Sequence, residues 1–121
     1  MPAAAGEWTI LEYERTRGDV PVRTFIDSLT HRNANDAAAL ILKLRARGNM
    51  LRGRDSEIVT GQRNLFELRG HQVRIFYMFL PGRVAVLLDG IIKKQDKIPR
   101  ADLDRVLGYQ RDVERRGPRA P

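Results

Sequence analysis

Four charged residues in the middle of the chain have the types and the spacing of an anion-binding site: Glu67, Arg69, Arg74 and Asp89. They lie on predicted strands, where alternate residues share one face of a sheet. An arginine held between two carboxylates is preorganised, and its planar fork binds two phosphate oxygens at once. We therefore expect Arg74 to bind a phosphate; the alternative is a solvated sheet face whose ion pairs contribute little.

A run of cations follows the last predicted strand, at Lys93, Lys94, Lys97 and Arg100. A solvated loop is the ordinary explanation for such a run. Because the run begins just after the strand that carries Asp89, it can also bring positive charge to the same face. Both interpretations stay open at the level of sequence.

His71 and Phe76 are two further candidates near the charged face. The histidine lies in a predicted tight turn, where it is either an idle surface residue or a proton-transfer group, since imidazole titrates near neutral pH. The phenylalanine either packs under a loop or stacks on a nucleobase, a contact worth about 1–3 kcal/mol.

The apolar pattern predicts the elements that position these residues. A strand is expected over residues 8–13, and Asp19 is expected to cap a first amphipathic helix. Asn33 or Asn35 is expected to cap a second helix that ends at Gly48. Further strands are predicted over 58–60, 65–69, 72–80 and 83–92, followed by a helix after Pro99.

Two short turns suggest a register for these strands. A two-residue loop at Gly70-His71 sets Glu67 opposite Arg74, and a turn centred on Pro81-Gly82 sets Asp89 opposite Arg74. This register divides the strand residues between two faces. The expected core face, against the helices, carries Phe66, Leu68, Val73, Ile75, Tyr77, Val86 and Leu88, and the other carries Glu67, Arg69, Arg74, Phe76, Leu87 and Asp89.

Composition limits the class of protein. The 121 residues include 22 Lys and Arg against 15 Asp and Glu, a net charge of +7 that favours a polyanionic partner. The chain has no cysteine and two histidines, so a metal site is not expected. No segment is predicted to cross a membrane, and we expect a cytoplasmic protein. One domain is expected over 1–116, with a disordered tail over 117–121.

Several segments together resemble a known family. Residues 64–69, 73–77, 86–94 and 97–99 look like the RelE/ParE superfamily, specifically its HigB-like branch, which includes phage-derived toxin-like proteins. The order of elements matches along nearly the whole chain. The resemblance implies an α+β fold, in which an antiparallel meander sheet carries an N-terminal strand and a two-helix hairpin packed on one face, and ends in a C-terminal helix.

The resemblance also implies an activity. Most members are toxins of type II toxin-antitoxin systems that cut messenger RNA on the ribosome, without a metal or any other cofactor, by attack of a ribose 2′-oxygen on the neighbouring phosphate. The usual partner is a HigA-like antitoxin with a helix-turn-helix domain. Two alternatives stay open: a ParE-like inhibitor of DNA gyrase, and a noncatalytic, phage-derived module that binds RNA or an antitoxin.

Carried over residue by residue, the resemblance assigns Arg74 to the scissile phosphate. It assigns supporting catalytic roles to Arg69, Lys93 and Lys94, and the remaining candidates for RNA contact are Phe76, Lys97, Arg100 and His71. The chain departs from the family where archetypes have strand lysines, at Leu65 and Glu67, and Tyr109 is an uncertain counterpart of a C-terminal tyrosine. The general base is therefore unassigned among Glu67, His71 and Lys94.

Overall fold

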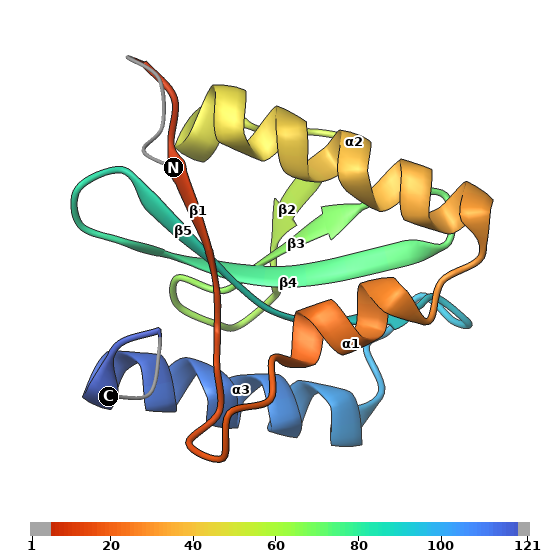
Figure 1. Cartoon of the computed structure of the whole chain (residues 1–121). Coiled ribbons are helices and arrows are strands. Elements are labelled where there is room, and N and C mark those ends of the chain that lie inside the picture. Colours follow the sequence, from red (N-terminus) through yellow and green to blue (C-terminus); the bar gives the residue numbers. More distant parts are fainter. Residues whose placement is uncertain (1–5, 119–121) are drawn as a thin grey trace.

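The computed structural model describes residues 6–118 of the chain. A five-stranded sheet has the strand order β1-β5-β4-β3-β2, and helices lie on both of its faces (Figure 1). This is the α+β architecture that the sequence predicted. In chain order the elements are β1 (Thr9–Glu12), α1 (Pro21–Asp27), α2 (His31–Arg47), a 3-10 helix (Gly48–Met50), β2 (Ser56–Ile58), β3 (Phe66–Arg69), β4 (Val73–Leu80), β5 (Val84–Ile92) and α3 (Arg100–Arg116).

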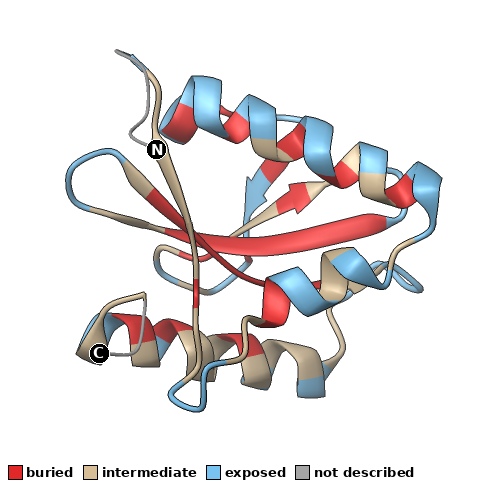
Figure 2. Ribbon diagram, viewed as in Figure 1, coloured by how far each residue is buried: buried red, intermediate tan, exposed pale blue. Residues whose placement is uncertain are grey.

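Each face of the sheet has its own apolar layer. Helices α1 and α2 cover one face, where Leu44 packs in the same cluster as Ile75 of β4. Helix α3 covers the opposite face, where Val106 packs in the same cluster as Phe76. Strand β4 is consequently buried along most of its length (Figure 2). The face that the sequence predicted to be charged therefore has an apolar layer of its own under α3.

The hairpin between β3 and β4 is shifted by two residues from the predicted register. Arg69 pairs with Arg74, and Glu67 pairs with Phe76 instead of Arg74. The backbone N–H of Gly70 donates to the carbonyl of Val73 (3.0 Å), so His71 and Gln72 form the loop. A shift of two residues leaves every side chain on its predicted face, because side chains alternate with a period of two.

The hairpin between β4 and β5 overturns part of the predicted faces. Leu80 pairs with Val84, which leaves Pro81, Gly82 and Arg83 as a three-residue loop. Gly82 and Arg83 both have positive φ there, +85° and +62°. The extra loop residue places each of the following side chains on the opposite face of the sheet from the predicted one. Leu87 therefore lies in the layer under α1 and α2, while Val86 and Leu88 lie in the layer under α3.

A β-bulge then reverses this inversion. The register shifts between Phe76 and Tyr77, so Asp89 pairs with Phe76 and Ile91 pairs with Arg74. Asp89 thus returns to the predicted face, but it does not stand opposite Arg74 as expected. The loop and the bulge each add one residue, and together they restore the original alternation.

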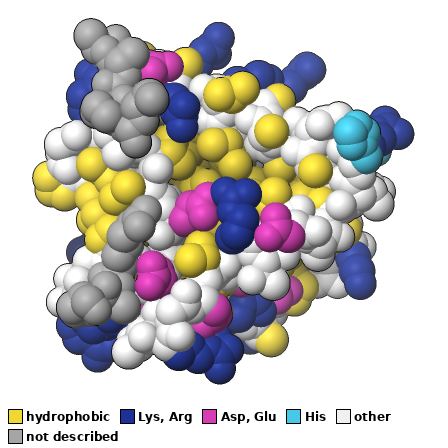
Figure 3. Space-filling view, viewed as in Figure 1, with side chains coloured by type: hydrophobic (Ala, Val, Ile, Leu, Met, Phe, Trp, Pro, Cys, Tyr) yellow, Lys and Arg dark blue, Asp and Glu magenta, His cyan; other side chains and the backbone are white. Residues whose placement is uncertain are grey.

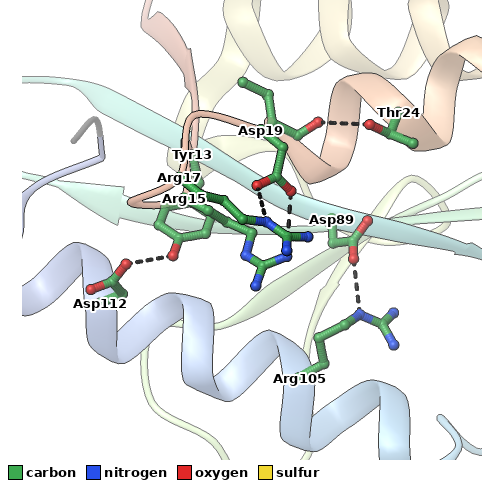
Figure 4. A network of polar contacts seen from close by, with 9 residues as sticks. Tyr13, Arg15, Arg17, Asp19, Thr24, Asp89, Arg105 and Asp112 are labelled. Carbon is green, nitrogen blue, oxygen red and sulfur yellow. Dashed lines mark hydrogen bonds and ion pairs between the residues drawn. The ribbon is translucent and has the colours of Figure 1, made fainter.

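Both N-terminal helices begin at residues other than the predicted caps. Val20 is the N-cap of α1, and Asp19 instead accepts from Arg17 (2.8 Å), as seen in Figure 4. Helix α2 begins at His31, and its cap is Thr30, whose hydroxyl accepts from the backbone N–H of Asn33 (3.3 Å). A threonine cap satisfies the same free N–H group that an asparagine would.

The N-terminal strand joins the sheet itself. β1 pairs with β5 in parallel, with Thr9 beside Val84, and forms one edge of the sheet. Just beyond β1, the N–H of Glu14 donates to the carbonyl of Pro118 (2.7 Å), which holds the chain after α3 against this edge. Residues 119–121 of the expected disordered tail lie outside the described residues.

Gly48 sits where the indole of Trp8 closes over the end of α2. A Cβ on Gly48 would lie 2.0 Å from Cε2 of Trp8, and the residue has a φ of +52°. We expect Gly48→Ala to lower the free energy of unfolding by about 2–4 kcal/mol, the sum of backbone strain and overpacking. Gly61→Ala is the matched control, since Gly61 has a φ of +80° and open space around it. Urea unfolding of both variants measures the difference, and equal losses would contradict the role of Trp8.

Candidate functional site

One candidate site joins the loop after β5 to four other elements, β3, β4, α1 and α3. Its volume is about 540 Å³. β3 and β4 supply one charged side chain each, and α1 and α3 close its sides. We call it the Arg74 pocket; it is lined by Phe25, Ser28, Glu67, Arg74, residues 91–99 and Asp102.

Arg74 is held in place by the backbone. Its Nη1 donates to the carbonyls of Gly70 (2.7 Å) and Val73 (2.9 Å), and its Nε lies 3.8 Å from Oε1 of Glu67. Burial lowers the pKa of the guanidinium, and Glu67 opposes that shift. An arginine remains cationic at any physiological pH, so Arg74 presents a fixed, largely buried positive charge to the pocket.

Glu67 is the carboxylate that faces Arg74. Its side chain is 14% exposed, and its Oε1 also lies 3.4 Å from Nε of Arg69. Burial raises the pKa of this carboxyl above its usual range, while the charges of Arg69 and Arg74 act in the opposite direction. A partly desolvated carboxylate with a raised pKa is a stronger base than a solvated one, and is suited to proton abstraction.

Three lysines of the loop after β5 complete the pocket. The N–H of Lys93 donates to the carbonyl of Gln72 (2.6 Å), which ties the start of the loop to the β3–β4 turn. The Nζ of Lys93 lies 3.6 Å from Asp96. Among the described residues, Lys94 and Lys97 have no ion-pair partner, so their charges are available to an anion.

Asp89 does not hold Arg74 as the sequence predicted. Its Oδ2 accepts from Nε of Arg105 on α3 (3.0 Å), a contact visible in Figure 4. The same guanidinium donates through Nη1 to Asp102 (2.8 Å), a residue of the pocket wall. Arg105 therefore joins β5 to the first turns of α3 and neutralises a carboxylate that would otherwise repel an anion.

Not every predicted site residue reaches the pocket. Phe76 is fully buried in the layer under α3 and exposes no ring face to a base, so the predicted stacking role is wrong for this fold. His71 is exposed, but it lies beside Asp36, which accepts from its backbone N–H (2.9 Å). Arg100 is paired with Asp104 (3.3 Å) on the surface of α3. Arg69 lines an adjoining hollow that shares Glu67 and Lys97 with the Arg74 pocket.

The structure adds pocket residues that the sequence analysis missed. Phe25 comes from α1, Ser28 is the C-cap of that helix, and Asp102 comes from α3. Only Asp102 left a sequence signal, as the i, i+3 partner of Arg105 on one helix face. The contribution of α1 depends on how the helix sits over β5, where a Cβ on Gly90 would lie 2.4 Å from the ring of Phe25.

No metal site and no membrane span are found in the part of the chain that the structure describes. No group of three or more His, Asp or Glu side chains within residues 6–118 is placed to bind a metal ion. None of the helices in that range is long and apolar enough to cross a bilayer.

The chemistry open to the pocket residues is binding of a phosphate by Arg74 and the lysines, with proton transfer at Glu67.

Comparisons with known proteins place the chain in a family. Residues 24–108 match the family model described as "Phage derived protein Gp49-like (DUF891)", a range that includes every residue lining the Arg74 pocket. The search of curated proteins found no match. One similar solved structure is the toxin-antitoxin complex RelBE2 from Mycobacterium tuberculosis, at 15% sequence identity and a TM-score of 0.47, covering 78% of this chain and 100% of that one.

Proposed function

Because this chain belongs to the Gp49-like family of phage-derived proteins, which are RelE-type toxins, we propose that it is the toxin of a type II toxin-antitoxin system and cuts messenger RNA on the ribosome. The observation that carries the activity is the pairing of Arg74 with Glu67 in one pocket that Lys94 and Lys97 also line. A fixed cation can stabilise the charge that develops when a ribose 2′-oxygen attacks its phosphodiester, and a partly desolvated carboxylate can accept the hydroxyl proton.

The proposed reaction begins at the 2′-hydroxyl of the nucleotide before the scissile bond. Glu67 accepts the hydroxyl proton, and the 2′-oxygen attacks the adjacent phosphorus. The bond from phosphorus to the 5′-oxygen breaks, and the leaving oxygen takes a proton from Lys94. The products are a 2′,3′-cyclic phosphate and a 5′-hydroxyl end.

Arg74 stabilises the negative charge that develops on the phosphoryl oxygens. Its two bonds to backbone carbonyls fix the guanidinium before substrate arrives, so little reorganisation is needed in the transition state. Lys97 adds positive charge to the pocket lining, and Arg69, two residues further along β3, holds Glu67 through an ion pair. The ribosome would align the substrate against the pocket.

The partners follow from the same proposal. A HigA-like antitoxin with a helix-turn-helix domain would bind the basic toxin, and the substrate would be messenger RNA in the cytoplasm. The net charge of +7 is consistent with both polyanionic RNA and an acidic antitoxin segment.

Brief induced expression in a bacterial host tests the proposal, with primer extension on a translated messenger and on an untranslated control RNA. We expect wild-type cuts within translated codons only, and a loss of about 10²–10³-fold in cleavage for Arg74→Ala. Arg63→Ala removes an exposed arginine outside the pocket and is expected to cut like the wild type.

The other outcomes assign the other functions. Cuts in both RNAs would indicate a ribonuclease that acts without the ribosome. Growth arrest without cuts would indicate that the protein inhibits gyrase or binds its target without catalysis, and that it is not a nuclease. Equal thermal stability of Arg74→Ala and the wild type shows that any loss of cutting is chemical.

A further inference from the structure

The outer face of α2 carries an apolar ridge where a surface helix ordinarily carries polar residues. Ala38, Leu42 and Ala46 follow one another at intervals of four, so they lie along one line of the helix. All three are exposed, and Leu42 is 61% exposed. Met50, in the 3-10 turn that follows α2, is 74% exposed.

This ridge is distinct from the face that α2 uses for folding. The buried side chains of α2 include Ala37, Leu40 and Leu44, which point to the sheet. The ridge points away from it, and no residue of α2 lines the Arg74 pocket. Burial of the ridge is therefore not needed by the fold or by the proposed chemistry.

Basic residues predominate in the segment that carries the ridge. Residues 37–54 contain five cations and no carboxylate, and among them Lys43 alone has an ion-pair partner in the described chain, Asp55 (3.4 Å). Figure 3 shows Lys and Arg side chains next to hydrophobic ones along the upper edge, where α2 runs in Figure 1. The cations without a described ion-pair partner are Arg45, Arg47, Arg52 and Arg54.

We propose that this surface, the α2 ridge with its flanking arginines, binds an acidic amphipathic helix of a partner protein. The small side chains of Ala38 and Ala46 let a partner backbone approach closely on either side of Leu42. Leucine-like side chains of the partner would cover the ridge, and its carboxylates would meet Arg45 and Arg47.

The charge excludes the simplest other occupant. A second copy of the chain would set the arginines of one ridge against those of the other. The carboxylates that border the segment, Asp36 and Asp55, already accept from the His71 N–H and pair with Lys43. A nucleic acid would pair with the arginines but would gain nothing from covering Leu42 and Met50. The combination of an apolar line and cationic margins fits an acidic helix best.

Fluorescence anisotropy tests the proposal with the full chain and a labelled synthetic peptide that places leucines on one helical face and glutamates on the other. A scrambled peptide of the same composition is the control ligand. We expect binding of the patterned peptide that the double variant L42Q/M50Q weakens by at least about tenfold. I58Q removes a similarly exposed apolar side chain, 50% exposed on β2, and is expected to bind normally.

The charged margin has its own pair of variants. R45Q/R47Q is expected to weaken binding by about fivefold and to make it less dependent on salt. R111Q, on the exposed side of α3, is expected to change neither. Equal binding of the patterned and scrambled peptides, unchanged binding by L42Q/M50Q, or a dimer in sedimentation that L42Q/M50Q abolishes would overturn the proposal.

Discussion

Replacing Glu67 by glutamine is expected to reduce the rate of messenger cleavage by about 10²–10⁴-fold, because the amide cannot accept the 2′-hydroxyl proton. Glutamine keeps the size and the polarity of the side chain, so the contact with Arg74 is altered less than by alanine. The measurement is single-turnover cleavage of a defined messenger in a purified translation system, with purified toxin added last.

Glu57→Gln is the matched control for this variant. Glu57 pairs with Glu67 across β2 and β3, bonds to Arg69, and lies outside the Arg74 pocket. We expect it to leave the cleavage rate within about twofold of the wild type, as an exposed ion pair contributes little. A loss equal to that of Glu67→Gln would mean that Arg69, which both carboxylates contact, limits the reaction.

The pH dependence of cleavage gives a second readout for Glu67. The carboxylate is the active form of a base, so the rate is expected to rise with pH as Glu67 loses its proton. Because burial raises its pKa, the midpoint should lie above the value of about 4.3 for an unperturbed glutamate. If Glu67→Gln is as active as the wild type and keeps the same pH profile, the base is Lys94 or His71 instead.

The second large effect is expected on stability. Phe76→Ala should lower the free energy of unfolding by about 3–5 kcal/mol, since it leaves a cavity in the layer under α3. The ring is fully buried there in the same cluster as Met78, Leu88 and Val106. Equilibrium unfolding in urea, followed by circular dichroism, measures the loss.

Phe76→Leu separates packing from RNA contact. Leucine keeps most of the apolar volume, and we expect it to cost about 1.5 kcal/mol or less and to leave cleavage intact. An exposed ring that stacks on a base would behave in the opposite way. In that case both variants would keep the wild-type stability, and both would weaken RNA binding.

The sequence predicted the elements well because their signals are local. Alternating apolar residues marked the strands, and Pro21, Gly48 and Pro99 marked the ends of helices. Arg74 and Glu67 share a face in the structure for the same reason, although they are not paired directly. An error of two residues in a hairpin register leaves the alternation intact.

The errors arose where one residue changes the alternation. The loop at 81–83 has three residues because Arg83 adopts positive φ. This conformation is uncommon for an arginine, and the Pro-Gly pair gives no sequence signal for it. The bulge beside Phe76 has no sequence signal that we recognise. Together they misplaced Leu87 and its neighbours while returning Asp89 to its predicted face.

The burial of Phe76 was not predictable from its own strand. Its face of the sheet was predicted correctly. Whether that face is covered depends on where α3 lies, and the periodicity of a C-terminal helix does not show which face of the sheet it packs against. The same limit applies to Phe25 and Ser28, which reach the pocket only because α1 packs over β5. Long-range packing decided both cases.

The parallel pairing of β1 with β5 sets the order in which the chain can fold during its synthesis. Thr9 pairs with Val84, 75 positions later in the chain, so this edge of the sheet cannot form until Val84 is available. Because closure of so long a loop costs chain entropy, we expect this step to follow the formation of the hairpins among β3, β4 and β5. The Arg74 pocket in turn draws its lining residues from Phe25 to Asp102, so it cannot be complete until Asp102 has been synthesised and has left the ribosome.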